Sequence, residues 1–289
     1  MRVLVTGGRG QLGTALQAAL AKHRVLAVDL PEVDVTSYDS TMAAADAFGP
    51  DVVVHAAAAT DVDGCERDPD LAYRVNALGT QNVALACRRV GAALVAISTD
   101  YVFDGMKGEP YLEFDEPRPL SVYGRSKLAG ERYAQTLHDR VYVVRPAWLF
   151  SAVGKSFART MLRLSAERDE LTVVDDEVGT PTYAPDLAAA LAELIEHPRY
   201  GVYHLVNEGS CSRFEFVQEL IRLAGRPTRV TPISTAEYLR LHPLPARRPA
   251  DSRLRNFCAA TALGIRLRPW KEALAEMLGR RDGTTDEHE

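Results

Sequence analysis

A tyrosine and a lysine four positions apart are the residues most suited to chemistry. Tyr123 and Lys127 stand in a segment predicted to be helical to about residue 137. A four-residue spacing places both on one helix face. A phenol has an unperturbed pKa of about 10, and a neighbouring ammonium lowers it by stabilising the phenolate. The pair therefore suits a proton donor to a carbonyl oxygen during hydride delivery, although the same pattern is common on solvated helix faces.

A hydroxyl side chain lies upstream, where a predicted strand ends. The apolar run 93–97 is followed by Ser98-Thr99-Asp100. In a parallel sheet the carboxyl ends of the strands line the ligand crevice. The sequence therefore predicts that Thr99 presents its hydroxyl beside the Tyr123 phenol. The alternative is a strand-end cap without a ligand.

A glycine-rich loop joins the first predicted strand to the first helix. Its sequence is Thr6-Gly7-Gly8-Arg9-Gly10-Gln11-Leu12-Gly13. Glycines at 7, 10 and 13 let the backbone turn tightly and approach a pyrophosphate at the helix N-terminus. Three glycines alone are a weak signal and also fit a tight turn without a ligand.

Asp29 closes the second predicted strand, where a carboxylate can accept hydrogen bonds from the adenosine ribose. Its charge opposes a 2′-phosphate and favours NADH. Arg9 in the glycine loop could offset this and admit NADPH. The sequence leaves this competition, and the alternative that Asp29 is an ordinary exposed acid, open.

The elements that must position these residues alternate between strand and helix. Apolar runs at 3–5, 25–28, 51–55 and 93–97 are separated by helical segments at 15–22, 41–48 and 70–90, the second started by Ser40 or Thr41. Continuous apolar runs indicate strands covered on both faces. We expect an α/β fold, a Rossmann-type doubly wound parallel sheet.

The pattern changes after Trp148, where proline and glycine become more frequent. We predict an NAD(P)-binding Rossmann domain at 1–150 and mainly a smaller α/β substrate domain at 151–289. Predicted strands at 171–174 and 201–206 belong to the second domain. Part of 179–198 could pack back on the first domain, and 280–289 forms a flexible tail.

Composition narrows the class of protein. The chain has 289 residues, 46% of them hydrophobic and 25% charged, and its net charge is −5 from 34 basic and 39 acidic residues. This charge gives no general attraction to nucleic acid. No apolar run approaches the roughly 18 residues of a membrane span, and no signal peptide is evident. Four cysteines show no CxxC spacing and seven histidines show no metal spacing, so we expect a cytoplasmic protein without a metal site.

Longer motifs carry a family resemblance that covers nearly the whole chain. The strings are Ala56-Ala57-Ala58-Ala59-Thr60-Asp61-Val62-Asp63, Val75-Asn76-Ala77, Ser98-Thr99-Asp100-Tyr101-Val102-Phe103-Asp104-Gly105, Arg145-Pro146-Ala147-Trp148, Gly179-Thr180-Pro181-Thr182 and Arg248-Pro249-Ala250-Asp251-Ser252. With the glycine loop and the Tyr-Lys pair, they resemble the dTDP-4-dehydrorhamnose reductase family of the extended short-chain dehydrogenase/reductase superfamily. The resemblance implies reduction by NADPH or NADH of the C4 ketone of a dTDP-sugar, dTDP-4-dehydro-L-rhamnose, and allows a homodimer.

The resemblance implies roles by position. Tyr123 would be the acid, Lys127 would bind the nicotinamide ribose and tune Tyr123, and Thr99 would orient the carbonyl. The cofactor-binding positions would be Gly7, Gly10, Gln11, Leu12, Asp29, Asp34, Val35, Ala58, Ala59, Thr60 and Asn76, together with Tyr123 and Lys127. The substrate-binding positions would be Thr99, Asp100 and Trp148.

The substrate diphosphate also needs local cations, and Arg247 and Arg248 in a Pro-flanked loop are the best candidates. They could also be solvated loop charges. The chain departs from the family pattern at Ala59, at Asp251 and in Arg255-Asn256-Phe257-Cys258, which weakens the carry-over for the substrate lobe.

Two other functions stay open. One is another nucleotide-deoxysugar ketoreductase, an epimerase or a dehydratase, although Tyr101 follows Asp100 where dehydratases usually carry a glutamate. The other is a non-catalytic binding subunit of the same fold, against which the retained Thr99, Tyr123 and Lys127 argue.

Overall fold

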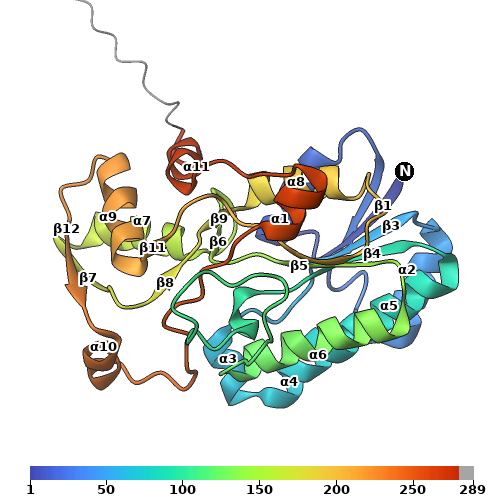
Figure 1. Cartoon of the computed structure of the whole chain (residues 1–289), viewed down its shortest axis with the longest axis horizontal. Helices are drawn as coiled ribbons and strands as arrows, with labels where there is room; N and C mark the ends of the chain where they lie inside the picture. The colour runs from blue at the N-terminus through green and yellow to red at the C-terminus, as the bar shows by residue number, and fades with distance from the viewer. Residues whose placement is uncertain (280–289) are drawn as a thin grey trace, which may run out of the picture.

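Six parallel strands form the central sheet, in the order β10-β5-β4-β3-β1-β2 (Figure 1). The structure is a computed structural model that describes residues 1–279, so the predicted tail at 280–289 lies outside the described residues. The strands are β1 (Arg2–Thr6), β2 (Arg24–Val28), β3 (Val52–His55), β4 (Ala93–Ile97), β5 (Val141–Arg145) and β10 (Gly201–His204).

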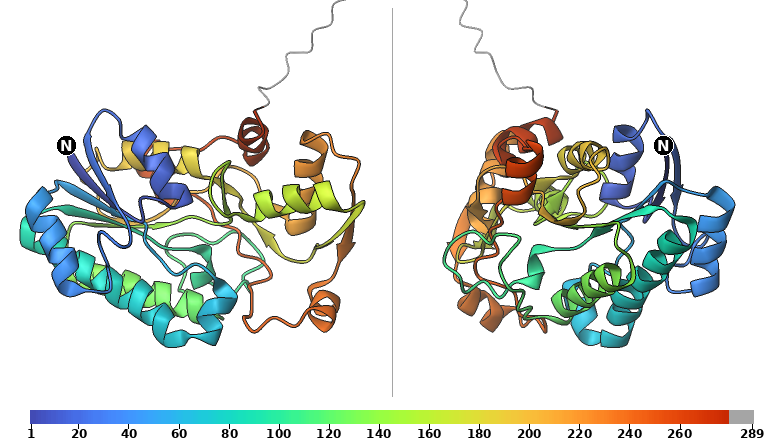
Figure 2. Two further views of the ribbon diagram at one scale, coloured as in Figure 1. Left: turned by 180° about the vertical axis from the view of Figure 1, so that it is seen from behind. Right: turned by 45° about the vertical axis from the view of Figure 1, so that its right-hand side comes forward.

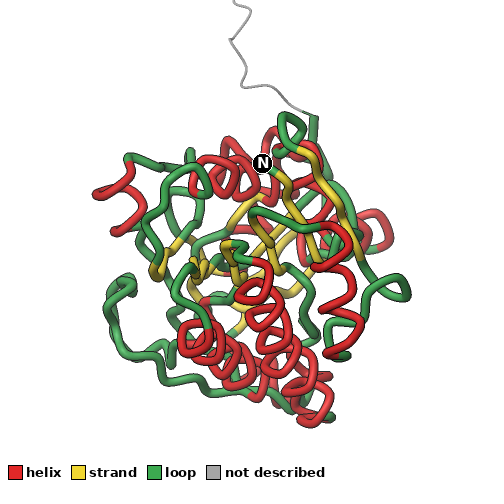
Figure 3. Tube along the Cα trace, turned by 90° about the vertical axis from the view of Figure 1, so that its right-hand side faces the viewer, coloured by secondary structure: helices red, strands yellow, loops and turns green. Residues whose placement is uncertain are grey.

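Helices cover both faces of this sheet (Figures 2 and 3). On one face α1 (Gln11–Ala19) packs against α8 (Ala184–Leu194). On the other lie α2 (Tyr38–Phe48), α5 (Gly79–Val90) and α6 (Val122–Leu137). All residues of β3 and β5 are buried between these layers, which explains their unbroken apolar runs. The predicted Rossmann-type sheet is confirmed.

The chain returns to the sheet after residue 150. Besides α8, strand β10 pairs in parallel with β5 and extends the sheet at one edge. The strand predicted at 201–206 as part of the second domain is therefore an edge strand of the central sheet.

A second group of elements lies beyond the carboxyl ends of the strands (Figure 1). It contains β6 (Leu149–Phe150), α7 (Phe157–Glu167), β7 (Glu170–Val174), β8 (Val178–Gly179), β9 (Thr182–Tyr183), β11 (Cys211–Ser212), α9 (Arg213–Leu223), β12 (Arg229–Ile233), α10 (Thr235–Leu241) and α11 (Trp270–Met277). β7 pairs with β12, and an apolar core of its own includes Phe150, Phe216 and Trp270. The π-turn η3 (Ala259–Leu263) instead packs into the apolar core between the sheet and the helices α1 and α8.

Two predicted helices differ in detail. α2 begins at Tyr38 because the Ser37 side chain accepts a hydrogen bond from the Ser40 amide, so neither Ser40 nor Thr41 starts the helix. The predicted helix 70–90 is divided into α4 (Pro69–Tyr73), the π-turn η1 (Arg74–Leu78) and α5. Such turns often lie at functional sites.

Short helices complete the chain: α3 (Val62–Arg67) precedes α4, and η2 (Asp100–Val102) follows β4. Among the described helices, none is long and apolar enough to cross a membrane.

Candidate active site

A cleft of about 670 Å³ opens along the carboxyl ends of the sheet strands. It meets the ends of β1, β2, β3, β4 and β5 at or just after their last residues. A second cavity of about 580 Å³ adjoins it among α7, β7, α9 and α10. The two share the lining residues Val62, Tyr101, Phe157 and Arg213. We call them the cofactor cleft and the outer cavity.

The glycine loop forms a close backbone cradle in the cofactor cleft. Gly7 has φ +72°, and a Cβ there would lie 2.6 Å from the Ala57 amide nitrogen. A Cβ on Gly13 would lie 2.1 Å from the Gly7 carbonyl oxygen. In the described part of the chain, no side chain caps α1 at Gly10. Its first-turn amides, next to the cleft-lining Gln11 and Leu12, therefore suit a pyrophosphate.

Asp29 lies at the cleft wall, and its carboxylate accepts the Arg9 backbone N–H at 3.0 Å. The Arg9 guanidinium points away to the Leu30 carbonyl and to Glu32, 2.5 Å from its carboxylate. The group that could bind a 2′-phosphate is thus held by an exposed ion pair in this structure. Asp34 and Val35 line the same end of the cleft.

The segment after β3 contributes only in part. Ala58 and Thr60 line the cleft, whereas Ala59 and Asn76 are not among the described residues that line either cavity. The Asn76 amide accepts the Ala59 N–H at 2.8 Å and donates to the Ala59 carbonyl and the Ser126 hydroxyl. Because its bonding groups are used by the protein, Asn76 holds the loop behind the cleft, and its contact with the cofactor stays a prediction.

Tyr123, Lys127 and Thr99 all line the cofactor cleft. Burial raises the pKa of Tyr123 above its ordinary value, and hydrogen bonding with the Thr99 side chain acts in the opposite direction. The Lys127 ammonium donates to the Ile97 carbonyl at 2.6 Å, and burial lowers its pKa to about 8. The sequence led us to expect a lowered pKa for Tyr123, but its pKa is raised because the effect of burial is larger than that of the neighbouring groups. The phenol is therefore fully protonated, as a proton donor must be.

Asp100 connects these residues to the C-terminal part of the chain. Its carboxylate accepts the Thr99 hydroxyl at 3.0 Å and the Ser252 hydroxyl at 2.6 Å. The carboxyl is buried, and burial raises its pKa to about 6.

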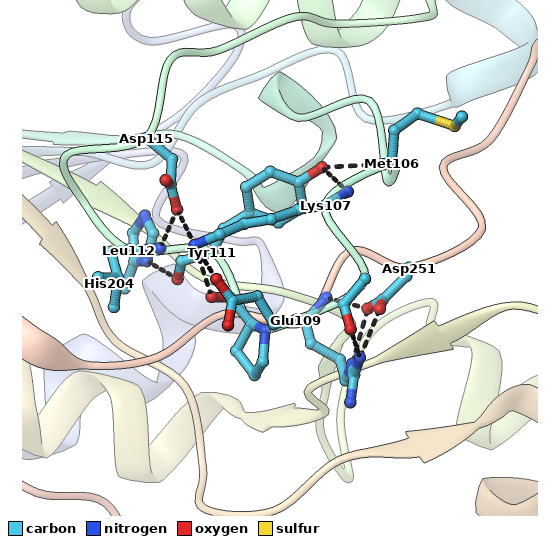
Figure 4. Close-up of polar contacts among 11 residues, drawn as sticks. Met106, Lys107, Glu109, Tyr111, Leu112, Asp115, His204 and Asp251 are labelled. Carbon is cyan, nitrogen blue, oxygen red and sulfur yellow. Dashed lines mark hydrogen bonds and ion pairs between the residues drawn. The ribbon is translucent and has the colours of Figure 1, made fainter.

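A network around Tyr111 holds the segment that carries Ser252 (Figure 4). Tyr111 exchanges backbone hydrogen bonds with Arg253 and Arg255, and its hydroxyl donates to Asp104 at 2.7 Å. Asp251, one of the departures from the family pattern, binds Arg253 at 2.6 Å. Asp251 thus stabilises the turn that delivers Ser252 to Asp100.

Trp148 and Arg213 form the boundary between the two cavities. Trp148 has φ +43°, a conformation costly for a non-glycine residue and frequent at functional sites. Its indole fits against Gly179, where a Cβ would lie 2.3 Å from the ring. The Arg213 guanidinium stacks 3.6 Å from the indole centroid and lies 3.6 Å from Glu177.

Arg213 was not predicted from the sequence. Its local signal is the Ser212–Glu215 capping box, which marks only the start of α9.

The two predicted arginines lie at the outer cavity and differ from each other. Arg247 is exposed, whereas the Arg248 guanidinium binds the Asp63 carboxylate of α3 at 2.7 Å. Asp63 also accepts the Ala246 N–H. Arg248 is therefore already paired, not the free cation expected, and the pair fixes the loop against the sheet domain. Among the described residues, no group of three or more His, Cys, Asp or Glu could hold a metal ion.

Comparison with known proteins shows the family to which this chain belongs. The RmlD substrate binding domain matches residues 1–282. The spore coat polysaccharide biosynthesis protein SpsK of Bacillus subtilis is 39% identical, with 99% of each chain covered. A dTDP-4-dehydrorhamnose reductase of Mycobacterium tuberculosis is 43% identical, covering 96% of this chain and 92% of its own.

A solved structure shares the fold. The dTDP-4-dehydrorhamnose reductase of Bacillus anthracis, in complex with NADP, superposes with a TM-score of 0.92 at 40% identity, covering 96% of this chain and 98% of that one. These matches confirm the predicted resemblance. The chain belongs to the RmlD substrate binding domain family, the family of the dTDP-4-dehydrorhamnose reductases.

Proposed function

We propose that this chain reduces the C4 ketone of dTDP-4-dehydro-L-rhamnose to dTDP-L-rhamnose, with NADH or NADPH as the reductant. The observation that carries the proposal is that Tyr123, Lys127 and Thr99 line the same cleft as the glycine cradle. Relatives named dTDP-4-dehydrorhamnose reductase support a dTDP-sugar as the substrate class. A cytoplasmic location and a homodimer, expected from the sequence, stay part of the proposal.

The cofactor fits the first half of the cleft. The cradle of Gly7, Gly10, Gln11 and Leu12 would hold the diphosphate through backbone amides. Asp29 would accept the adenosine ribose hydroxyls, with Asp34, Val35, Ala58 and Thr60 along the remaining wall. When bound, the reduced nicotinamide supplies the hydride. Asn76 would act from behind by fixing Ala59.

The central residues would handle the proton. Tyr123 keeps its proton because burial raises its pKa, and it would donate that proton to the oxygen on which negative charge develops. An alkoxide is a stronger base than a phenolate, so the transfer is downhill even from a phenol of raised pKa. Lys127 would bind the nicotinamide ribose and stabilise the resulting phenolate. Thr99 would orient the carbonyl, fixed by its hydrogen bond to Asp100.

The sugar nucleotide would extend across the boundary into the outer cavity. Trp148 offers an apolar face to the sugar, and Arg213 places a guanidinium where both cavities meet. A guanidinium binds phosphate oxygens in a bidentate way, so Arg213 is a better diphosphate ligand here than the paired Arg248. Arg247 would add charge at the exposed rim, and Asp100 would hold the sugar through its free lone pairs.

Cofactor oxidation with a defined sugar tests the proposal. Purified protein is mixed with NADH or NADPH and dTDP-4-keto-6-deoxyhexose, with and without the companion 3,5-epimerase that inverts the sugar. The proposal expects oxidation of one cofactor for each sugar reduced, with the epimerised sugar preferred. Conversion without net cofactor loss supports an epimerase. Cofactor binding without any turnover supports the binding-subunit alternative.

A further inference from the structure

A buried ion pair lies directly beneath the catalytic face of α6. The Glu131 carboxylate accepts two hydrogen bonds from Arg145, the last residue of β5, at 2.9 Å from Nε and 2.6 Å from Nη2. Both side chains are only 3–4% exposed. The Ser98 hydroxyl also donates to Glu131. Sequence analysis assigned none of these three residues a role.

The spacing along α6 relates the Glu131–Arg145 pair to the catalytic residues. Tyr123, Lys127 and Glu131 follow one another at four-residue intervals, so they share one face of α6. Opposite them, three consecutive residues at the end of β4 receive them. Lys127 binds the Ile97 carbonyl, Glu131 binds the Ser98 hydroxyl, and Tyr123 lines the cleft beside Thr99. The catalytic face of α6 therefore packs against the end of β4, and the contact made by Glu131 is the ion-paired one.

We propose that Glu131 is a positioning residue for the proposed reduction, whose carboxylate, anchored by Arg145, fixes the Lys127 ammonium and the end of β4 beneath the Tyr123 hydroxyl. Glu131 itself touches none of the reacting atoms. The inference rests on the proposed function for its kinetic consequence, but not for its effect on Lys127.

The charge of Glu131 also acts on Lys127. Burial lowers the pKa of Lys127 to about 8, and the Glu131 charge is the influence that opposes the fall. The ionisable groups of the neighbouring elements are Glu131 on α6 and His55 on β3, whose charges couple to this lysine, Tyr123 on α6 and Asp100 after β4, which line the same cleft, and Arg145 on β5, which binds Glu131. His55 is neutral at working pH, because burial lowers its pKa to about 3. Without the Glu131 carboxylate, the effect of burial on the pKa of Lys127 is unopposed, and Lys127 loses its proton at lower pH.

The substitution Glu131→Gln tests this, because it keeps the shape and removes the charge. The protonation of Lys127 is followed by NMR of ¹³C-labelled lysine, a readout independent of turnover. The chain has five lysines, Lys22, Lys107, Lys127, Lys155 and Lys271, so the Lys127 signal is assigned with Lys127→Arg. We expect the pKa of Lys127 to fall by about one unit or more in Glu131→Gln and to be largely restored in Glu131→Asp. An unchanged pKa overturns the inference, whether or not the wild type reduces the sugar.

Turnover gives the second readout. We expect the kcat of Glu131→Gln to fall at least about ten-fold at pH 7.5, with KM for the sugar little changed, and its ratio to wild type to rise as pH is lowered. The matched control is Asp186→Asn, which breaks the bidentate pair with Arg268 away from the cleft. This variant should lose stability without a pH-dependent change in the ratio. A kcat of Glu131→Gln that keeps the same ratio to the wild-type kcat at every pH contradicts the inference.

Removal of the carboxylate leaves Arg145 unpaired in the interior, which can prevent folding. The double variant Glu131→Leu with Arg145→Met removes both buried charges together and replaces Glu131→Gln in that case. It should fold and bind NADH but lose at least about ten-fold in kcat, because Glu131 no longer holds the end of β4 and Lys127 in place. Wild-type kcat in the double variant overturns the proposal.

Discussion

The cofactor cleft and the outer cavity are built in different ways. The cofactor cleft consists of strand ends and the turns that follow them, so its glycine cradle, Asp29 and Thr99 are placed by neighbouring backbone. The outer cavity depends on side chains from distant segments, such as Arg248 on Asp63, 185 positions away. The first region is positioned by the topology of the sheet, which suits residues that carry out chemistry. The second depends on pairs of charges that a substrate diphosphate can compete for.

This contrast predicts that changes in the cofactor cleft alter kcat, whereas changes at the boundary and beyond alter KM. The largest effect is expected for Tyr123→Phe, which removes the proton donor and leaves the cleft wall in place. Turnover should fall by about 10³-fold, within the range for general acid catalysis, while NADH binding stays within about two-fold. Steady-state kinetics and a fluorescence titration of NADH measure the two. The mechanism fails if the variant reduces the sugar at near the wild-type rate.

Asp100 lines the cofactor cleft and accepts a hydrogen bond from Ser252 in the C-terminal part of the chain. Its variant tests whether burial holds the pKa of this carboxyl above its ordinary value. Its folded pKa of about 6 lies above the ordinary aspartate value of 3.8, because burial disfavours the charged form. Its stabilising contribution is therefore present below pH 3.8 and is lost as pH rises through 6. Asp100→Asn has no such dependence. The stability of wild type relative to this variant should fall by about 2 kcal/mol between pH 4 and pH 7.

Urea unfolding of both proteins at each pH measures this difference. Asp139→Asn, at an exposed position, is the matched control and should show no comparable change. A constant difference between wild type and Asp100→Asn would show that Asp100 keeps an ordinary pKa.

Arg213→Gln probes the boundary. Loss of the guanidinium should raise KM for the sugar nucleotide by about 10- to 100-fold, the range for a hydrogen bond to a charged group. The kcat and NADH binding should change little. Arg163→Gln, on the exposed face of α7, is the control. An equal loss in kcat with unchanged KM would place Arg213 in the chemical step instead of substrate binding, and would weaken the division between the regions.

The smallest effect concerns cofactor choice. Glu32→Gln releases the Arg9 guanidinium from its exposed ion pair, so Arg9 becomes available to a 2′-phosphate. The ratio of NADPH to NADH affinity should rise by about three-fold, since such surface pairs are weak. Titration of both cofactors without sugar measures the ratio. If the ratio is the same in variant and wild type, Arg9 does not contribute to it, and Asp29 remains the residue that determines the choice between NADH and NADPH.

The cofactor cleft could be predicted from the sequence further than the outer cavity could. Thr99 follows an apolar run, and Tyr123 and Lys127 share a helix spacing, so local rules bring them to one edge. Burial is not local, which is why the direction of the Tyr123 pKa was wrong. The partners of Arg213 and Arg248 come from distant segments, and no spacing rule identifies them.

The most direct test of the central claim follows the hydride. NADH deuterated at the transferred position is incubated with the protein and the 4-keto sugar, and the product is examined by NMR and mass spectrometry. The account predicts one deuterium at C4 of the sugar for each NADH oxidised, and almost none with Tyr123→Phe. A product without deuterium, or a converted sugar with the NADH unconsumed, would contradict it.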